Sequence, residues 1–252
     1  MSHDDNWVGR NPEKDKLRNS VWTALKENGV AVGDPFHAIP DFKGSEKAAA
    51  LLTSLDEWKK AKVMMACPDP PQIPVRLNAL KDGMTVYMAI PKLVDEKCFV
   101  ELTAKKILEQ NASLEEAATW QGAMKYGKPV TFEEMLEVDI TITGCVAVTR
   151  SGGRTGKGAG FADLEYSLMR KFNKITDKTP VITTVHPMMI VTEERLPIQK
   201  HDTYLTMIAT PEEVIRIDRD RPQPKLDWSD VRKDQIESIP ILKKLLDEEK
   251  AN

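Results

Sequence analysis

The sequence is poor in cysteine. Its three cysteines, Cys67, Cys98 and Cys145, are an odd number, and none belongs to a Cys-x-x-Cys pair. This pattern argues against a disulfide framework and against a structural zinc site. Isolated thiols are typical of a reducing compartment, so we expect a cytoplasmic protein.

Long apolar runs and a strong charge of either sign are also missing. No stretch of about 18 apolar residues occurs, which argues against a membrane-spanning helix, and no secretory signal is recognised. The formal net charge is −3, so no general attraction to nucleic acid or to anionic membranes is expected. With 252 residues, 41% hydrophobic and 30% charged, the composition is that of a globular protein.

Glycine is scarce too, but it is concentrated at one place. Five of the 13 glycines lie within residues 152–160, together with Arg154 and Lys157. The apolar run 139–148 before this loop predicts a buried strand, and residues 161–172 after it predict a helix. Glycine lets backbone N–H groups approach a ligand closely, and a helix N-terminus adds partial positive charge. Phosphate is the ligand that these features indicate.

Two well-known phosphate motifs do not match this loop. A Walker A loop needs four residues between its first glycine and the Gly-Lys pair, but only three separate Gly152 from Gly156. The dinucleotide fingerprint needs a glycine where the chain has Phe161. The alternative is a flexible glycine loop with two solvated cations. The strand before the loop and the helix after it favour the phosphate site.

Helical and strand-like patterns alternate along the chain. The proline-rich stretch 67–74 is neither helix interior nor central strand, so it predicts a loop at a strand end. Ser113, followed three residues later by Glu116, predicts a capped helix over 113–121, whereas 97–110 is ambiguous. The other expected helices are 13–28, 46–60, 75–81, 161–172 and 231–250, the last interrupted near Pro240, and the expected strands are 63–66, 85–90, 139–148, 179–185, 203–208 and 214–217.

This alternation predicts an α/β fold, with helices on both faces of a mostly parallel sheet. The chain shows no Gly- and Ser-rich linker and no internal repeat of the length typical of solenoids. We therefore expect a single domain over residues 13–217, with residues 218–252 forming a C-terminal arm and helix packed on it.

Three blocks of the sequence carry a resemblance to a known family. They are Lys14-Asp-Lys-Leu-Arg18, the loop Arg154-Thr-Gly-Lys-Gly-Ala-Gly-Phe-Ala-Asp163, and the stretch 197–210 with its His201-Asp202 pair. In this order they resemble the conserved blocks of the 5-formyltetrahydrofolate cyclo-ligase (methenyltetrahydrofolate synthetase) family. Ile39-Pro-Asp-Phe-Lys-Gly44 is similar to the branch called methenyltetrahydrofolate synthetase domain-containing proteins.

The resemblance implies a three-layer α/β/α fold of the sugar-isomerase and CoA-transferase type. It also implies that ATP and Mg²⁺ drive the cyclisation of 5-formyltetrahydrofolate to 5,10-methenyltetrahydrofolate. Arg154 and Lys157 would be catalytic, because phosphoryl transfer needs positioning and charge neutralisation, and Asp163 would hold Mg²⁺. The residues expected to bind ATP are Lys14, Arg18, Gly153, Arg154, Gly156, Lys157, Gly158, Gly160 and Phe161.

The sequence departs from the family pattern at two places. Where the family has Tyr-Tyr-Asp-Arg, this chain has Phe161-Ala162-Asp163-Leu164, so one aromatic ring and one cation are missing. Glu165 then adds a negative charge close to the expected phosphate site. The loop 68–74 replaces a Glu-x-x-Thr segment that lines the folate pocket of the family, and Asp69 and Gln72 are the two candidates to replace its carboxylate.

These departures leave two alternatives to the cyclo-ligase. One is an ATP-dependent enzyme that acts on another anionic substrate, and the other is a non-catalytic nucleotide- or RNA-binding relative. The net charge of −3 and the lack of a basic patch interleaved with aromatic residues argue against nucleic acid as a partner. We expect a folate-type small molecule as substrate and no membrane association, and the oligomeric state stays open.

Three other residues near these blocks are expected to be structural. His186 and His201 lack the spacing of zinc ligands, and His201-Asp202 is expected to form a turn. Cys145 lies beside the glycine loop within a predicted buried strand, so packing is favoured over a nucleophilic role.

Overall fold

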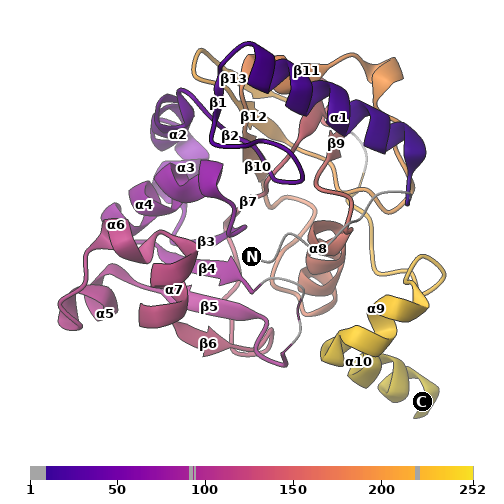
Figure 1. Ribbon diagram of the computed structural model, residues 1–252. Helices are drawn as coiled ribbons and strands as arrows, with labels where there is room; N and C mark the ends of the chain where they lie inside the picture. The colour runs from indigo at the N-terminus through magenta and orange to yellow at the C-terminus, as the bar shows by residue number, and fades with distance from the viewer. Residues whose placement is uncertain (1–9, 91–92, 94, 219–221, 252) are drawn as a thin grey trace.

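The structure is a computed structural model of the chain, and it describes residues 10–90, 93, 95–218 and 222–251. An eight-stranded sheet lies at its centre (Figure 1). The strand order is β13 (Val214–Arg216), β12 (Met207–Ala209), β10 (Val181–Thr184), β7 (Ile140–Ile142), β3 (Val63–Ala66), β4 (Thr85–Ala89), β5 (Phe99–Leu102) and β6 (Lys128–Val130). The five strands from β12 to β4 are parallel, whereas β13, β5 and β6 join in antiparallel pairs. The sheet is therefore mixed and mostly parallel.

Helices lie on both sides of this sheet. Figure 1 shows α2 (Ser45–Thr53), α4 (Ile73–Lys81), α6 (Leu114–Ala117) and α7 (Trp120–Tyr126) on one side and α8 (Phe161–Lys171) on the other. α9 (Lys233–Ser238) and α10 (Pro240–Ala251) pack beside α8, where Lys171 Nζ lies 2.7 Å from Glu249 Oε1. The remaining helices are α1 (Pro12–Glu27), α3 (Asp56–Lys60) and α5 (Ala104–Glu109). The α/β fold predicted from the alternating pattern is confirmed.

A second, three-stranded sheet carries the glycine loop. Its order is β11 (Ile190–Val191), β8 (Ala147–Thr149) and β9 (Arg154–Thr155), and a separate two-stranded sheet joins β1 (Ala31–Val32) to β2 (Asp41–Phe42). The single strand predicted over 139–148 is wrong, because the chain leaves the main sheet after β7 and enters the small sheet at β8. Thr143 N still donates to Ile182 O of the main sheet at 2.9 Å, but Val146 N donates to Thr155 O of the small sheet at 2.8 Å.

Several boundaries also differ from the sequence prediction. The segment 46–60 is two helices, because Leu55 between them has an extended backbone (φ −71°, ψ 146°). α4 starts at Ile73, earlier than predicted, because Pro74 lies in its first turn, where a missing N–H costs little. Ser113 caps α6 as predicted, accepting from Glu116 N at 3.1 Å, but α6 ends at Ala117 and α7 follows. The ambiguous segment 97–110 contains β5 and α5.

Gly152 forms the turn between β8 and β9 in a conformation that favours glycine (φ +93°). A Cβ atom there would lie 2.5 Å from Leu205 O. We expect Gly152→Ala to lower the free energy of unfolding by about 1–3 kcal/mol, from backbone strain and from the displaced contact. Urea unfolding would measure this. Gly33→Ala is the matched control, since Gly33 also has a positive φ (+76°) but, outside its own chain neighbours, no atom of the described residues lies within 4 Å of the added carbon. Equal costs at the two glycines would contradict the proposed contact.

Candidate nucleotide and substrate site

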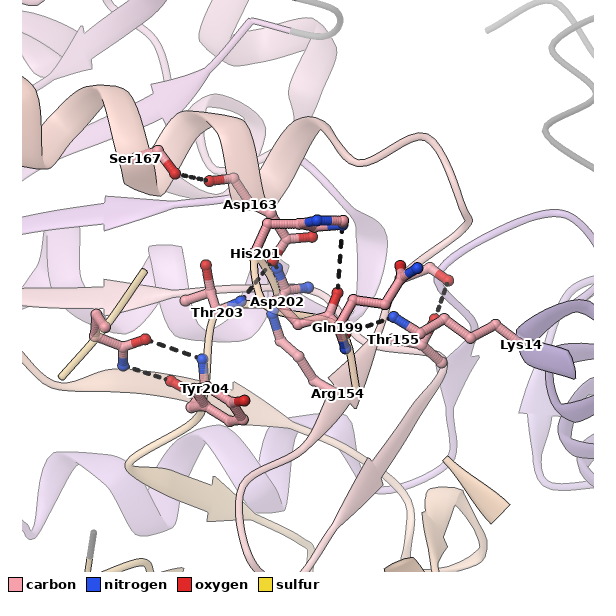
Figure 2. Close-up of polar contacts among 12 residues, drawn as sticks. Lys14, Arg154, Thr155, Asp163, Ser167, Gln199, His201, Asp202, Thr203 and Tyr204 are labelled. Carbon is pink, nitrogen blue, oxygen red and sulfur yellow. Dashed lines mark hydrogen bonds and ion pairs between the residues drawn. The ribbon is translucent and has the colours of Figure 1, made fainter. Parts of the chain in front are cut away.

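A buried ion pair fixes the start of α8 against the small sheet. Arg154 lies in β9, and its Nη2 donates to Asp163 Oδ1 in the first turn of α8 (Figure 2). The same carboxylate oxygen accepts from Thr203 N at 2.9 Å. Burial acts against the charge of Arg154, but the carboxylate of Asp163 raises the pKa of Arg154 above its ordinary value. The structure thus places the buried Arg154 and the partly buried Asp163 together, and their pair joins β9, α8 and the segment around Thr203.

A second buried ion pair joins α1 to the closing block of the resemblance. Lys14 Nζ lies 2.6 Å from Asp202 Oδ2, and less than a tenth of either side chain is exposed. Asp202 Oδ2 also accepts from Gln199 N at 2.7 Å, so it holds its own turn together. The expected turn at His201-Asp202 is therefore present. The role of Asp202 as counterion of Lys14 was not predicted, although both residues belong to blocks of the resemblance.

Arg18 connects α1 to the backbone of the glycine loop. Its Nε donates to Gly156 O at 2.7 Å and its Nη2 to Thr155 Oγ1 at 3.0 Å, while Asp15 pairs with its Nη1. Burial lowers the pKa of Arg18, and the carboxylate of Asp15 opposes that shift. Gly158 has φ +109°, and a Cβ there would lie 3.2 Å from the Arg18 guanidinium. Arg18 therefore helps to set the shape of the loop.

Lys157 and Asp69 connect the loop to the end of β3. Lys157 Nζ lies 3.2 Å from Asp69 Oδ1, and 32% of the Lys157 side chain is exposed. Arg76 of α4 supports this end of β3, because its buried guanidinium donates to Cys67 O and, at 3.2 Å, to Asp69 O. Burial lowers the pKa of Arg76 to about 10, so it stays cationic at neutral pH. Among the four cations expected to bind ATP, Lys157 is by far the most exposed.

The structure distinguishes between the two residues expected to replace the carboxylate of the folate pocket. Gln72 is fully buried, and its Nε2 donates to Thr184 Oγ1 at 3.2 Å. Its Oε1 accepts from Cys67 Sγ at 3.4 Å. Asp69, in contrast, faces the glycine loop through Lys157. Gln72 therefore has a structural role in this arrangement, and Asp69 is the residue that borders the site.

Glu165 is a buried carboxyl group at the same site. Only 7% of it is exposed, and it forms no hydrogen bond or ion pair with any residue in the described part of the chain. Burial is the largest cause that raises the pKa of Glu165, to about 8, and the negative charge of Asp69 adds to the shift. Arg154 and Lys157 act in the opposite direction. From the sequence, Glu165 was expected only to add a negative charge near phosphate. The one sign in the sequence that Glu165 is buried is its position between Leu164 and Tyr166, which are themselves buried.

The other expected ATP-binding residues lie along the same stretch. Gly153 N donates to Thr149 Oγ1 at 2.9 Å, and the carbonyl oxygen of Gly156 accepts from Arg18 Nε at 2.7 Å. Gly160 has φ +78° and begins α8 without a side-chain cap. Phe161 follows it as a partly buried ring against the core. The structure thus brings Arg18 and Lys157 together at the glycine loop, and the role of these residues in binding ATP stays a prediction.

Two arginines outside the predicted motifs also approach the loop. Arg10 Nη1 donates to Ala159 O at 2.9 Å, and Arg232 Nη2 donates to the same oxygen at 3.5 Å. Both guanidinium groups also contact Asp234, at 3.3 Å and 3.1 Å. Burial lowers the pKa of Arg10, and the positive charge of Arg232 lowers it further. Two cations therefore lie beside the start of α8, the helix in which Leu164 replaces the cation of the family pattern.

The remaining candidates have structural surroundings. His186 Nδ1 accepts from Met188 N at 3.2 Å, and His201 lies 4.0 Å from Asp202 with 42% of its side chain exposed. Burial raises the pKa of Cys145, which disfavours its thiolate. Within the described ranges, no group of three or more His, Cys, Asp and Glu residues is arranged to hold a metal ion. No helix there combines the length and apolar character that a membrane span requires.

The comparison with protein families decides the classification. A model of the 5-formyltetrahydrofolate cyclo-ligase family matches residues 10–211. The chain belongs to this family. The matched region contains all the predicted site residues from Lys14 to Asp163, and also Arg10 at its first position, whereas Arg232, α9 and α10 lie beyond it.

Curated relatives are similar over most of this chain. A methenyltetrahydrofolate synthase domain-containing protein of Danio rerio is 33% identical over 241 residues, which are 94% of this chain and 63% of the relative. The Homo sapiens protein of the same description is 32% identical over 235 residues, or 92% of this chain and 61% of the relative. The chain thus spans less than two thirds of the length of these relatives.

A solved structure supports the fold. The NMR structure of Aquifex aeolicus 5,10-methenyltetrahydrofolate synthetase aligns with a TM-score of 0.52 and 20% identity, covering 84% of this chain and 96% of that protein. At this identity the likeness concerns the fold alone. The α/β arrangement of the cyclo-ligase family is therefore shared by this chain.

Proposed function

We propose that this protein binds ATP on the glycine loop and cyclises 5-formyltetrahydrofolate to 5,10-methenyltetrahydrofolate. The observation that carries the proposal is the convergence of α1, the glycine loop and the end of β3 on one place, through Arg18, Lys157 and Asp69. That place lies at the carboxyl edge of the parallel strands, where α/β proteins usually bind ligands. The proposal includes a three-layer fold of the sugar-isomerase and CoA-transferase type, with a domain over 13–217 and an arm over 218–252.

The exposure of the cations suggests how they divide their roles. Lys157 would contact the phosphates directly, because about a third of its side chain is exposed. Lys14, Arg18 and Arg154 are buried and paired, so they would hold the loop in shape and add positive potential. In the proposed reaction ATP phosphorylates the formyl oxygen of the substrate. N10 of the folate then attacks the carbon of the phosphorylated formyl group, and phosphate leaves. The loop would stabilise charge on the transferring group.

This site would hold Mg²⁺ only together with a bound nucleotide. Oδ1 of Asp163 already accepts from Arg154 and Thr203, which leaves Oδ2 as the available ligand atom. Mg²⁺ usually takes one or two carboxylates together with phosphate oxygens and water. Asp163 is therefore the residue that would hold it, and the ion would supply charge neutralisation for the phosphates.

The direct test is the appearance of the methenyl chromophore in the near-ultraviolet absorbance. Purified protein is mixed with 5-formyltetrahydrofolate, ATP and Mg²⁺, and each component is omitted in turn. A signal that requires all of them supports the proposal. A protein that ATP stabilises against heat but that never forms the chromophore would rule out the cyclisation.

Replacing Lys157 with alanine should separate binding from folding. We expect the affinity for ATP to fall about tenfold or more, because a hydrogen bond to a charged group is lost. The stability should change by less than about 1 kcal/mol, because the Lys157–Asp69 pair is partly exposed. Thermal shift with graded ATP would measure both quantities. Lys105→Ala is the control, since its side chain is 85% exposed on α5. An unchanged ATP affinity would remove Lys157 from the site.

A second candidate function is an ATP-dependent reaction on another anionic substrate. The replacement of the family's Tyr-Tyr-Asp-Arg by Phe161-Ala162-Asp163-Leu164 favours it, because the substrate side of the loop has changed. The pair Arg10 and Arg232 would supply positive charge there. ATP hydrolysis that other carboxylate-containing substrates stimulate, and 5-formyltetrahydrofolate does not, would favour this candidate over the cyclo-ligase. Stability raised by ATP with no hydrolysis would instead favour a non-catalytic nucleotide-binding relative.

A further inference from the structure

We propose that the Glu165 carboxyl group contacts the heterocycle of the substrate and accepts hydrogen bonds from its N–H donors. This inference rests on the proposed folate substrate. The starting observation is that Glu165 is 7% exposed and has no hydrogen-bond or ion-pair partner within the described part of the chain. The Glu165 oxygens are not among the fully enclosed side-chain atoms that lack a partner, so they are open to a ligand at the site.

The position of Glu165 on α8 separates it from the ion pair of Asp163. Two residues along a helix turn by about 200°, so Asp163 and Glu165 face different sides. Asp163 faces Arg154 in the small sheet. Glu165 interacts electrostatically with Asp69, which follows β3, and with Cys98, which precedes β5. Ile90, just after β4, donates to Cys98 O at 2.8 Å, so Glu165 lies toward the carboxyl edge of β3 and β4.

The charges around Glu165 indicate which part of a ligand it meets. Asp69 lies near it, and two carboxyl groups together disfavour phosphate. Lys157 and the loop are the better place for the polyphosphate. An ionised carboxylate can accept two parallel hydrogen bonds from an amino group and a neighbouring ring N–H, as on the 2-amino-4-oxo edge of a pterin, and such donors favour the ionised form of Glu165 when the ligand binds. Asp69 already pairs with Lys157, so Glu165, which has no partner among the described residues, is the carboxyl group that remains for this edge.

The substitutions Glu165→Leu and Glu165→Gln test the contact. Both remove a mostly buried ionisable group, so both variants should fold. The readouts are the dissociation constants of 5-formyltetrahydrofolate and of ATP, each from thermal shifts without turnover. We expect Glu165→Leu to weaken folate binding about tenfold or more, and to leave ATP binding within about twofold of the wild type. Glu165→Gln should be intermediate, because its amide oxygen still accepts one hydrogen bond.

Glu101→Gln serves as the control, because Glu101 of β5 is a partly buried carboxylate that pairs with Lys106 of α5. Its folate affinity should equal that of the wild type. Equal folate binding by wild type and Glu165→Leu would overturn the inference, and so would equal losses of folate and ATP binding. A wild-type protein that folate does not stabilise would overturn it as well. Selective loss of folate binding, in a protein that never forms the methenyl chromophore, would support the contact and reject the cyclisation.

Discussion

Replacing Arg154 with methionine should lower the free energy of unfolding by about 3–5 kcal/mol, because it leaves the mostly buried Asp163 carboxylate without its counterion. The side chain of Arg154 is 2% exposed and that of Asp163 is 19% exposed. The same substitution should abolish ATP binding, since α8 and β9 are joined by this pair. Urea unfolding measures the first effect and the thermal shift with ATP measures the second.

A double substitution separates the loss of the pair from the loss of packing. Arg154→Met combined with Asp163→Asn removes both charges, so it should recover part of the stability that Arg154→Met loses. Arg216→Met is the surface control, because Arg216 pairs with Glu57 but is 55% exposed, and it should cost less than about 1 kcal/mol. If Arg154→Met and Arg216→Met lowered the free energy of unfolding by similar amounts, the buried ion pair would contribute no more to stability than the exposed one. That result would also remove the basis for a rigid junction between β9 and α8.

The sequence predicted most elements whose cause is local. The N-cap of α6 at Ser113, the strand β3 and the helix α1 follow from capping chemistry and from the spacing of apolar residues. The strand predicted over 139–148 failed for a nonlocal reason. Residues on both sides of Gly144 are buried, so the pattern contains no sign that they belong to two sheets. β6 was missed because Pro129 argues against a strand, and it lies at the sheet edge, where proline is tolerated.

Among the site residues too, features with a local cause were predicted and features that depend on distant residues were not. Glycines near Arg154 and Lys157 indicated an anion site, because this chemistry can be recognised in a short stretch. The counterions could not be recognised, since Asp202 and Asp69 lie 188 and 88 residues away from the lysines with which they pair. Arg10 and Arg232 reach the same carbonyl from regions without a motif. Tertiary structure alone brings such charges together, and it also shows that most of the expected ATP-binding cations are buried.

Replacing Glu165 with glutamine should change how stability depends on pH. The pKa of Glu165 is raised to about 8 in the folded protein, first by burial and then by Asp69, whereas an unfolded chain has a glutamate pKa of about 4.3. Between these values the unfolded chain is ionised and the folded protein keeps the proton. Folding therefore takes up a proton, and stability contributed by this group falls by about 1.4 kcal/mol for each pH unit as pH rises through the window.

The difference between Glu165→Gln and wild type isolates this effect, because other titrating groups contribute equally to both proteins. Below about pH 4.3 the two proteins should be nearly equal in stability, because the wild-type carboxyl group is then neutral in both states. The advantage of the variant should grow from there to about pH 8 and remain constant above it. Urea unfolding at several pH values, with a chelator present to exclude bound metal, measures the difference. A constant difference across the window would show that Glu165 is ionised in the folded protein, with a cation or solvent near it. A stability difference that grows with pH would mean that Glu165 destabilises the folded protein at its candidate site. Such a cost is expected for a residue that serves ligand binding more than folding.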